Sequence, residues 1–262
     1  VTGAARGIGA ATVHELCRQG YRVIAVDIDG DAHDPHGIRA PGVDYALAST
    51  MDLAAVAAAH PDQVIPVTAD VRDLTALQDA AALAIVRFGR LDAAVAAAAV
   101  IIGGKPLWET PTEHLQTLLD IDVVGVWNTA ADTIPHMLNN PEPHGCRFVA
   151  VASAAGTHGL FRLAGYNVAK HAVIGLVRGL AADLVGTGVT AVAVSPGSTD
   201  TQMLQATAAI YDLKTVDEFI HSSPLRRILK PEELAETIAF CCSHTGAVLN
   251  GSVVSASGGF VG

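Results

Sequence analysis

Three polar side chains in the middle of the sequence, Ser153, Tyr166 and Lys170, have types and spacing that suit proton transfer. Ser153 follows an apolar run, 147–152, that is typical of a strand, and beyond it the apolar pattern becomes helical. Tyr166 and Lys170 are four residues apart, so on a helix they share one face. Open α/β sheets place ligand groups where strands end, as Ser153 would lie. We expect these groups to converge, although ordinary polar positions would give the same pattern.

This trio fits the oxidation of an alcohol, in which a base takes the hydroxyl proton while hydride leaves the carbon. A free phenol has a pKa near 10, which is too high for a base at neutral pH. Lys170 on the same helix face would stabilise the phenolate and lower the pKa of Tyr166. Ser153 would hydrogen-bond the substrate oxygen. In the opposite direction Tyr166 would donate the proton to a ketone.

A glycine-rich turn opens the chain, with Gly3, Gly7 and Gly9 leading into an amphipathic helix that reaches about Gln19. Such a turn cradles a diphosphate, because backbone N–H groups point at it and the helix dipole favours its charge. A strand normally precedes the turn. Because only Val1 stands there, we expect the numbering to begin inside the first strand.

The next apolar run, 21–26, ends at Asp27, where a dinucleotide fold places its ribose-binding acid. A carboxylate at this point accepts hydrogen bonds from the adenosine ribose and repels a 2′-phosphate. Arg6 favours the phosphorylated cofactor, because a basic residue in the turn can meet a 2′-phosphate. Asp27 would face the 2′ position directly, so we expect NAD rather than NADP.

Strand-like and helix-like patterns alternate along all 262 residues, with no linker and no repeat. They predict one α/β domain, 1–262, of the doubly wound Rossmann type with a mostly parallel, seven-stranded sheet. After the truncated first strand, we expect strands at 21–26, 64–68, 93–98, 147–152, 189–194 and 252–255. We expect helices at 50–60, 74–88, 112–138 and 165–185, another beginning at Pro231, and an irregular helical segment at 202–228.

A loop at 29–49 is long for a compact domain, where long loops without regular structure are usually functional. It follows the ribose-binding acid, so it could fold over the adenosine end of the cofactor. A surface insertion without such a role is the alternative.

Composition excludes several other classes of function. The net charge of −10 and the pI near 5.4 argue against a nucleic-acid partner, because no basic run is present to meet phosphates. The longest uncharged apolar run, 93–102, is about half of a membrane span. The four cysteines lack metal-ligand or disulfide spacing, which favours reduced thiols in the cytoplasm. The eleven histidines form no His-x-x-x-His pair, so we expect no metal site.

Taken as an ordered set, the motifs resemble those of the short-chain dehydrogenase/reductase family across essentially the whole chain. The set comprises Thr2-Gly3-Ala4-Ala5-Arg6-Gly7-Ile8-Gly9, Asp70-Val71, Ser153 with Tyr166-x-x-x-Lys170, and Pro196-Gly197. The resemblance implies an NAD-binding alcohol dehydrogenase or ketoreductase. Its implied cofactor contacts are Gly3, Arg6, Gly7, Ile8, Gly9 and Asp27 at the adenosine diphosphate half, Asp70 and Val71 at the adenine, the backbone of Ala97, Tyr166 and Lys170, Pro196 and Gly197, and Thr199 and Thr201 at the nicotinamide carboxamide.

Two positions depart from the family pattern. The usual Asn-Asn-Ala-Gly after the fourth strand is Ala96-Ala97-Ala98-Ala99, which removes polar side chains that steady the central sheet. The usual Asn of the long helix, which completes a relay to the lysine, is Asp122. If that role uses the backbone carbonyl, Asp122 serves as well. If it uses the side chain, a carboxylate near Lys170 would partly cancel the charge of Lys170 and raise the pKa of Tyr166. The third possibility is that Asp122 is an acidic residue of the helix without a catalytic role.

Within the family, the sequence is most similar to the mycofactocin-coupled subgroup. The similarity comes from the insertion at 29–49 and from three motifs, at 106–111, 149–157 and 195–199. It implies tightly held NAD that passes electrons to mycofactocin as an external acceptor. An ordinary dehydrogenase with exchangeable NAD is one alternative. A non-catalytic NAD-binding sensor on the same fold is another.

The substrate pocket should be closed by the loop 153–166 and by a lid at 202–228. Their apolar side chains predict a hydrophobic secondary alcohol or its ketone as substrate. We expect the apolar wall to contain Leu160, Phe161, Met203, Leu204, Ile210, Tyr211 and Phe219, with Trp108 nearby. Members of the family commonly pair the helices expected at 112–138 and 165–185 across two-fold axes. A homo-oligomer, and specifically a tetramer, is therefore implied.

Overall fold

The computed structural model describes residues 1–30 and 40–261 and has the expected α/β Rossmann-type architecture. Every strand pairing in these ranges is parallel. The strands are β1 (Val23–Asp27), β2 (Val64–Thr68), β3 (Ala93–Ala96), β4 (Arg147–Val151), β5 (Thr190–Pro196) and β6 (Val253–Ala256).

Strand order places the crossover of a doubly wound fold at the centre of the sheet. β1 pairs with β2, and β3, β4, β5 and β6 follow one another in sequence order. Thr2 joins the two groups, because it bridges both Val26 of β1 and Ala96 of β3. The seven-strand count is not confirmed: the described ranges hold six strands, and the place of the expected first strand is taken by the two bridges of Thr2.

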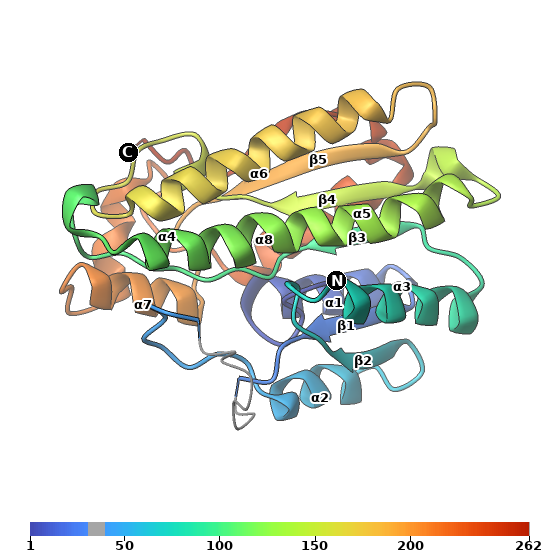
Figure 1. Cartoon of the computed structure of the whole chain (residues 1–262), viewed down its shortest axis with the longest axis horizontal. Helices are drawn as coiled ribbons and strands as arrows, with labels where there is room; N and C mark the ends of the chain where they lie inside the picture. Colours follow the sequence, from blue (N-terminus) through green and yellow to red (C-terminus); the bar gives the residue numbers. More distant parts are fainter. Residues whose placement is uncertain (31–39, 262) are drawn as a thin grey trace.

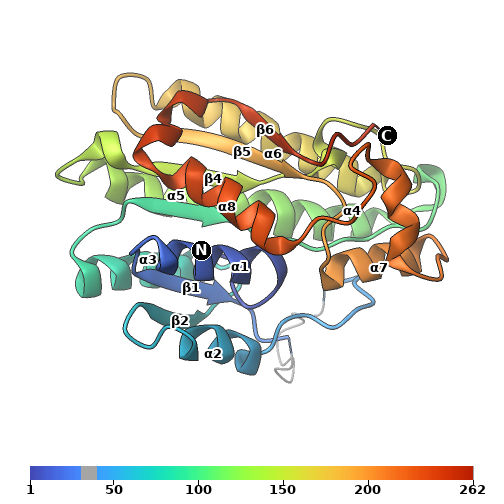
Figure 2. The same cartoon turned by 180° about the vertical axis from the view of Figure 1, so that it is seen from behind.

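Helices cover both faces of the sheet, as Figures 1 and 2 show from opposite sides. Apolar side chains of strands and helices pack into cores on both faces; Val149 and Val192 face one core, and Phe148 and Ala191 face the other. One face carries α3 (Leu74–Phe88), α4 (Thr112–Leu118), α5 (Gly125–Leu138) and α6 (Ala164–Asp183), and the other carries α1 (Gly7–Arg18), α2 (Thr50–Ala58) and α8 (Pro231–Cys242).

Capping residues set several of the helix boundaries where the sequence predicts them. Ser49 begins α2 with a complete capping box, in which its hydroxyl accepts from Asp52 N and the Asp52 carboxylate accepts from Ser49 N. Gly89 ends α3 with a left-handed φ of 84°, which glycine adopts without a steric penalty. Pro231 occupies the first turn of α8, where its missing N–H costs nothing.

The segment 112–138 is not the single α-helix that its pattern predicts. A π-helical turn, Leu119–Val124, separates α4 from α5 and contains Asp122. Wider turns of this kind often occur at functional sites. Here the turn brings the Asp122 carboxylate to the backbone N–H of Val100, 2.9 Å away, and beside Lys170. The apolar periodicity of the sequence is the same on both sides of the turn and gives no sign of it.

The third described strand, β3, ends at Ala96 rather than at Ala98. The reason is Thr2, whose hydroxyl accepts from the backbone N–H groups of Ala97 and Ala98 at 3.2 and 3.4 Å. Thr2 thus supplies a hydroxyl next to the all-alanine stretch that lacks the family's asparagines.

The lid, residues 202–228, lies at the carboxyl end of the sheet and contains α7 (Gln202–Ile210) and a 3₁₀ segment (Val216–Ser222). The Tyr211 hydroxyl at the end of α7 donates to the carbonyl of Phe161 at 2.7 Å, which ties the lid to the loop after β4. Over residues 1–30 and 40–261, no helix has the length and apolar character needed to cross a bilayer.

Candidate active site

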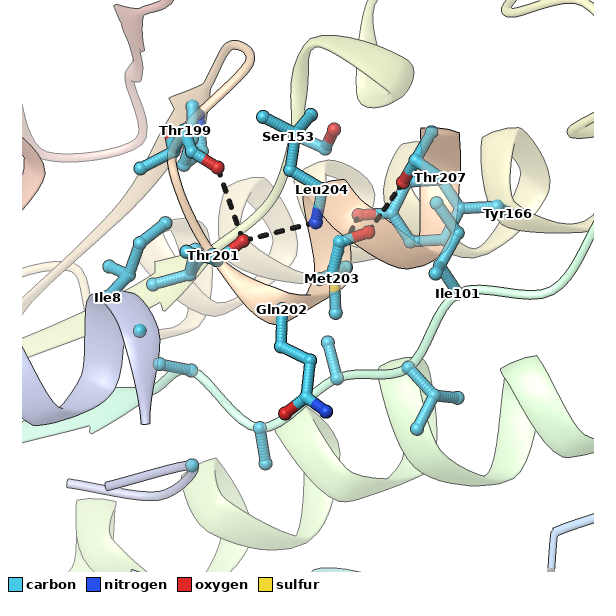
Figure 3. A pocket seen from close by; sticks show the side chains of 18 of the residues that line it. Ile8, Ile101, Ser153, Tyr166, Thr199, Thr201, Gln202, Met203, Leu204 and Thr207 are labelled. Atoms are coloured by element: carbon cyan, nitrogen blue, oxygen red, sulfur yellow. Dashed lines mark hydrogen bonds between the residues drawn. The ribbon is translucent and has the colours of Figure 1, made fainter. Parts of the chain in front are cut away.

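The end of β4 and the first turns of α6 bring Ser153, Tyr166 and Lys170 to one cavity. Ser153 caps a short 3₁₀ turn, because its hydroxyl accepts from Ala155 N at 3.1 Å. Tyr166 is buried, and its hydroxyl lies 4.0 Å from the sulfur of Met203 on the lid helix. Figure 3 shows Ser153 and Tyr166 together with the lid residues that line this cavity. The trio predicted from the sequence therefore shares one space.

Lys170 is fully buried and has three neighbours that hold its ammonium in place. Its Nζ donates to the carbonyl of Val151 at 3.4 Å, lies 3.3 Å from Asp122 Oδ2, and sits 5.5 Å from the centre of the Tyr166 ring. Burial alone lowers the pKa of Lys170. The Asp122 carboxylate and the Tyr166 oxygen outweigh burial and leave this pKa above its usual value.

Asp122 is a buried partner of Lys170 that does not line the cavity. One carboxylate oxygen accepts from Val100 N, and the other has, among the described residues, only the ion-pair contact with Lys170. Burial raises the pKa of Asp122, while the Lys170 charge and the Val100 N–H oppose that rise. Asp122 can therefore act on the reaction through Lys170, through its field at Tyr166, or by anchoring Val100, which lines the cavity.

The pKa of Tyr166 stays above that of a free phenol, mainly because burial disfavours the phenolate. Lys170 pulls this pKa down, Asp122 pushes it up, and the Ser153 side chain lowers it by hydrogen bonding. The expected lowering by Lys170 is thus present as one contribution, but in the protein alone it does not overcome burial.

The cavity has a volume of about 560 Å³ and runs along the carboxyl ends of the strands. Residues that follow β1, β2, β3, β4 and β5 all contribute to its wall, as a crevice at a topological switch point requires. Every residue expected to contact the cofactor lines it: Gly3, Arg6, Gly7, Ile8, Gly9, Asp27, Asp70, Val71, Ala97, Tyr166, Lys170, Pro196, Gly197, Thr199 and Thr201.

The glycine-rich turn fits a diphosphate in its local geometry. Gly3 and Gly7 have φ values of 66° and 53°, which favour glycine. A Cβ on Gly9 would stand 1.9 Å from the carbonyl oxygen of Gly3, so helix and turn pack with no room for a side chain. No side chain in the described part of the chain caps the N-terminus of α1, which leaves its first N–H groups available to an anion.

Asp27 stands at the end of β1, beside the turn. Its carboxylate accepts from Ala5 N and from Ile28 N, both at 2.8 Å. Burial raises the pKa of Asp27, and these two N–H groups partly offset that rise. A carboxylate held in this way keeps lone pairs for the two hydroxyls of an adenosine ribose.

Several predicted cofactor residues have polar groups that are engaged within the protein. The Thr199 hydroxyl donates to the Gly197 carbonyl at 3.0 Å. The Thr201 hydroxyl donates to the Thr199 carbonyl and accepts from Leu204 N, both at 3.2 Å, as Figure 3 shows. The Asp70 carboxylate accepts from the guanidinium of Arg72. Their roles toward a cofactor remain predictions.

Several polar residues in the cavity were not predicted from the sequence: Tyr45 from the insertion, and Arg72, Ser198, Gln202, Thr207 and Ser222. The Tyr45 hydroxyl accepts from Ile101 N at 3.1 Å, and its electrostatic neighbours include Asp122 and Tyr166. Burial raises the pKa of Tyr45 well above that of a free phenol. A tyrosine within a polar loop carries no periodic signal, so only the three-dimensional path of the loop identifies it.

The apolar wall agrees with the sequence in most positions. It contains Leu160, Phe161, Met203, Leu204, Tyr211 and Phe219. Two expected members do not line the cavity. Trp108 is 81% exposed on a short 3₁₀ turn, and Ile210 packs instead beside Gly103 and Gly104.

Comparison with known proteins adds to this geometry. A family model described as enoyl-(acyl carrier protein) reductase matches residues 3–261. The chain belongs to the short-chain dehydrogenase/reductase family. It is an NAD-dependent member, with the fold and reaction class of alcohol dehydrogenases and ketoreductases.

Curated members of this family that are more than 30% identical to the chain include two dehydrogenases of cyclic alcohols. One is (−)-trans-carveol dehydrogenase of Rhodococcus erythropolis, 33% identical over 78% of this chain and 72% of its own length. The other is cis-4-hydroxycyclohexanecarboxylate dehydrogenase of Sinomonas cyclohexanicum, 31% identical over 99% of this chain and 94% of its own length. Among solved structures, carveol dehydrogenase of Mycobacterium avium in complex with NAD superposes with a TM-score of 0.87 at 27% identity, covering 99% of this chain and 95% of that one.

Proposed function

We propose that this dehydrogenase interconverts a hydrophobic, cyclic secondary alcohol and its ketone, with Tyr166 exchanging the proton. The observation that carries the proposal is the convergence of Ser153, Tyr166 and Lys170 in one cavity with an apolar wall. NAD, when bound in this cavity, would supply the hydride acceptor. Ser153 orients the substrate oxygen, Tyr166 takes the hydroxyl proton, and Lys170 stabilises the phenolate that this transfer requires.

Water exclusion is part of the same arrangement. Met203 places a thioether beside the Tyr166 hydroxyl, and the lid is tied to the Phe161 carbonyl through Tyr211. A phenol in an apolar, enclosed site makes few competing hydrogen bonds, so its proton is directed to the substrate. A cyclic hydrocarbon skeleton suits this wall, and the names of the two curated relatives give a cyclic alcohol as substrate, carveol in one case and a cyclohexane that also bears a carboxylate in the other.

The first test replaces the proton carrier. Tyr166→Phe keeps the ring and its packing but removes the hydroxyl, so turnover of a panel of cyclic alcohols should fall by roughly 10²- to 10⁴-fold. NAD binding, measured by nucleotide release and mass spectrometry, should persist. If Tyr166→Phe keeps full turnover, the proton passes elsewhere. If the unaltered protein binds NAD yet oxidises no alcohol with any acceptor, the chain is an NAD sensor instead.

We also propose that NAD is held tightly and reoxidised in place by mycofactocin, as the subgroup resemblance implies. Support comes from residues 40–48, the described second half of the insertion, which we call the strap. The first half, 31–39, lies outside the described residues. The strap contacts both sides of the crevice: Tyr45 accepts from Ile101 N, and the Ala46 carbonyl accepts from Arg6 at 3.3 Å. Near its start, Gly42 packs so closely on the His114 ring that a Cβ would stand 2.7 Å away.

Retention can be measured directly. Purified protein should carry NAD(H), turn over poorly with free NAD alone, and turn over well with an artificial electron acceptor. Tyr45→Phe removes the acceptor for Ile101 N and should speed exchange with isotopically labelled NAD. Tyr21→Phe is the matched control, because the Tyr21 hydroxyl bonds the Cys242 carbonyl, away from the cavity. Nucleotide-free protein with brisk turnover on free NAD would indicate an ordinary dehydrogenase.

We also propose a tetramer, which the family resemblance implies, and a cytoplasmic location, which the cysteine pattern predicts. Trp127 and Val168 are 63% and 49% exposed on α5 and α6, which supports pairing of these helices in a tetramer. Light scattering of the purified protein tests this directly. The four cysteines are free and buried, which supports a reducing compartment such as the cytoplasm.

A further inference from the structure

Arg6, in the glycine-rich turn, is held by groups from three separate parts of the chain. Its Nε and Nη2 donate to the same oxygen of Asp52 at 3.0 and 2.7 Å. Its Nη1 donates to the carbonyl of Ala46 in the strap and to the side-chain oxygen of Gln202 at the start of the lid helix. The basic group that the sequence offers for a 2′-phosphate is therefore already bonded to other groups of the chain, in a pair whose two side chains are each 34% exposed.

Asp52 is fixed in a position that suits this pairing. The oxygen that pairs with Arg6 also accepts from the backbone N–H and the hydroxyl of Ser49, both at 2.8 Å. These bonds lower the pKa of Asp52 to about 2, with the Ser49 N–H as the largest cause and the Arg6 guanidinium next. Asp52 is thus a permanent anion at neutral pH, and its capping box prevents it from swinging away with Arg6.

This ion pair lies beside the ribose-binding acid. Asp27 accepts from the N–H of Ala5, the residue before Arg6, and both charges of the pair act on Asp27: Arg6 lowers its pKa and Asp52 raises it. Asp27 lines the cavity at the corner where a 2′-phosphate would lie, and Arg6, which also lines it, is paired with Asp52 just outside the cavity wall. The cation at this corner, Arg6, is already matched to a carboxylate.

We propose that Asp52 is a second determinant of cofactor choice, which excludes NADP by keeping Arg6 from its 2′-phosphate and by adding a second negative charge. The inference rests on the NAD dependence of the chain and extends it to a residue outside the dinucleotide fingerprint. It predicts that Asp27 alone does not set the preference. Once Asp27 is replaced, a 2′-phosphate still meets a guanidinium that is already paired with Asp52, whose carboxylate lies 2.7 Å from it.

The experiment is a mutational cycle on nucleotide-free protein, with charcoal removing any nucleotide that copurifies. Affinities for NAD and NADP are measured by calorimetry for Asp27→Ser, Asp52→Asn and the double variant. Each single variant should gain little NADP affinity. The gain in NADP affinity of the double variant should exceed the product of the two single gains by roughly tenfold or more. This is the size expected when Arg6 is freed to make a charge-assisted contact with the 2′-phosphate. Adding Arg6→Gln to the double variant should cancel the gain.

Two further variants separate selectivity from folding. Ser49→Ala weakens the helix cap but leaves Asp52 beside Arg6, so it should lower thermal stability without any gain in NADP binding. Gln202→Ala removes the contact between Arg6 and the lid. Combined with Asp27→Ser, it should not give the gain in NADP affinity that Asp52→Asn gives. Strict additivity of Asp27→Ser and Asp52→Asn, or a gain that survives Arg6→Gln, would overturn the inference. An unaltered protein that binds neither nucleotide would contradict NAD dependence itself, which is a different outcome.

Discussion

Replacing Asp122 by Asn should shift the pH profile of the reaction, because Asp122 opposes the effect of Lys170 on Tyr166. The two charges favour each other: Asp122 raises the pKa of Lys170, and Lys170 opposes the rise that burial causes in the pKa of Asp122. Asp122 Oδ2 lies 3.3 Å from Lys170 Nζ, which lies 5.5 Å from the Tyr166 ring centre, so the carboxylate is within about 9 Å of the ring. At an effective dielectric constant near 20, unit charges at that distance interact by about 1.8 kcal/mol.

That energy corresponds to a little more than one pKa unit. Asp122 raises the pKa of Tyr166, so Asp122→Asn should lower it by about one unit. Ketone reduction needs the protonated phenol and is lost as pH rises through this pKa. Its basic limb should therefore move to lower pH by about one unit, while the rising limb of alcohol oxidation moves in the same direction.

The assay is the pH dependence of kcat/KM in both directions with the best substrate from the alcohol panel. Asp120→Asn is the matched control, because Asp120 lies on the same π-helical turn but accepts from Gln116. The amide oxygen that Asp122→Asn introduces can still accept from Val100 N, so the loop after β3 keeps its anchor. Thermal stability should fall, because Lys170 loses its counter-charge. An unchanged profile would refute the electrostatic reasoning, and a shift to higher pH would mean that Lys170 loses its proton without Asp122.

Two more predictions concern the glycine-rich turn and the thiols. Gly9→Ala should abolish NAD binding and destabilise the fold by roughly 1–3 kcal/mol, because its Cβ would collide with the Gly3 carbonyl; Gly175→Ala in α6, with open space around it, should not. Denaturation curves and nucleotide release measure both, and a stable, NAD-bound Gly9→Ala would contradict the packing argument. Burial raises the pKa of Cys17, Cys146 and Cys241 to about 11 and that of Cys242 to about 12, so at pH 8 almost no thiolate exists. Ellman's reagent should label these thiols only as the protein unfolds, and rapid labelling of native protein would show that the core opens.

Periodicity and capping chemistry were sufficient to predict most elements, because each is a local property of the chain. The span of α3, its left-handed end at Gly89, and the first turn of α8 at Pro231 all follow from residues close in sequence. The π-helical turn around Asp122 could not be predicted in this way. It depends on Val100 and Lys170, which lie 22 and 48 residues away in sequence and contact Asp122 only after the sheet has formed.

The same distinction between local and long-range contacts applies to the residues of the site. Ser153, Tyr166 and Lys170 were predictable, because strand and helix patterns fix their positions relative to one another. Tyr45 was not, since its role depends on where an irregular loop crosses the crevice. Arg6 was identified, but its state was not: the sequence shows a cation near a phosphate site, and only the folded chain shows that Asp52 already engages it.

The contacts of Arg6 also connect cofactor choice with enclosure of the cavity. One guanidinium contacts the start of α2 through Asp52, the strap through Ala46 and the lid through Gln202. A 2′-phosphate that drew Arg6 away would therefore break contacts of the strap and the lid as well as an ion pair. NADP would lose affinity at the ribose and would also leave the cavity less enclosed. On this reasoning a variant that accepts NADP should exchange its nucleotide faster, so selectivity and retention should change together in the Asp27 and Asp52 cycle.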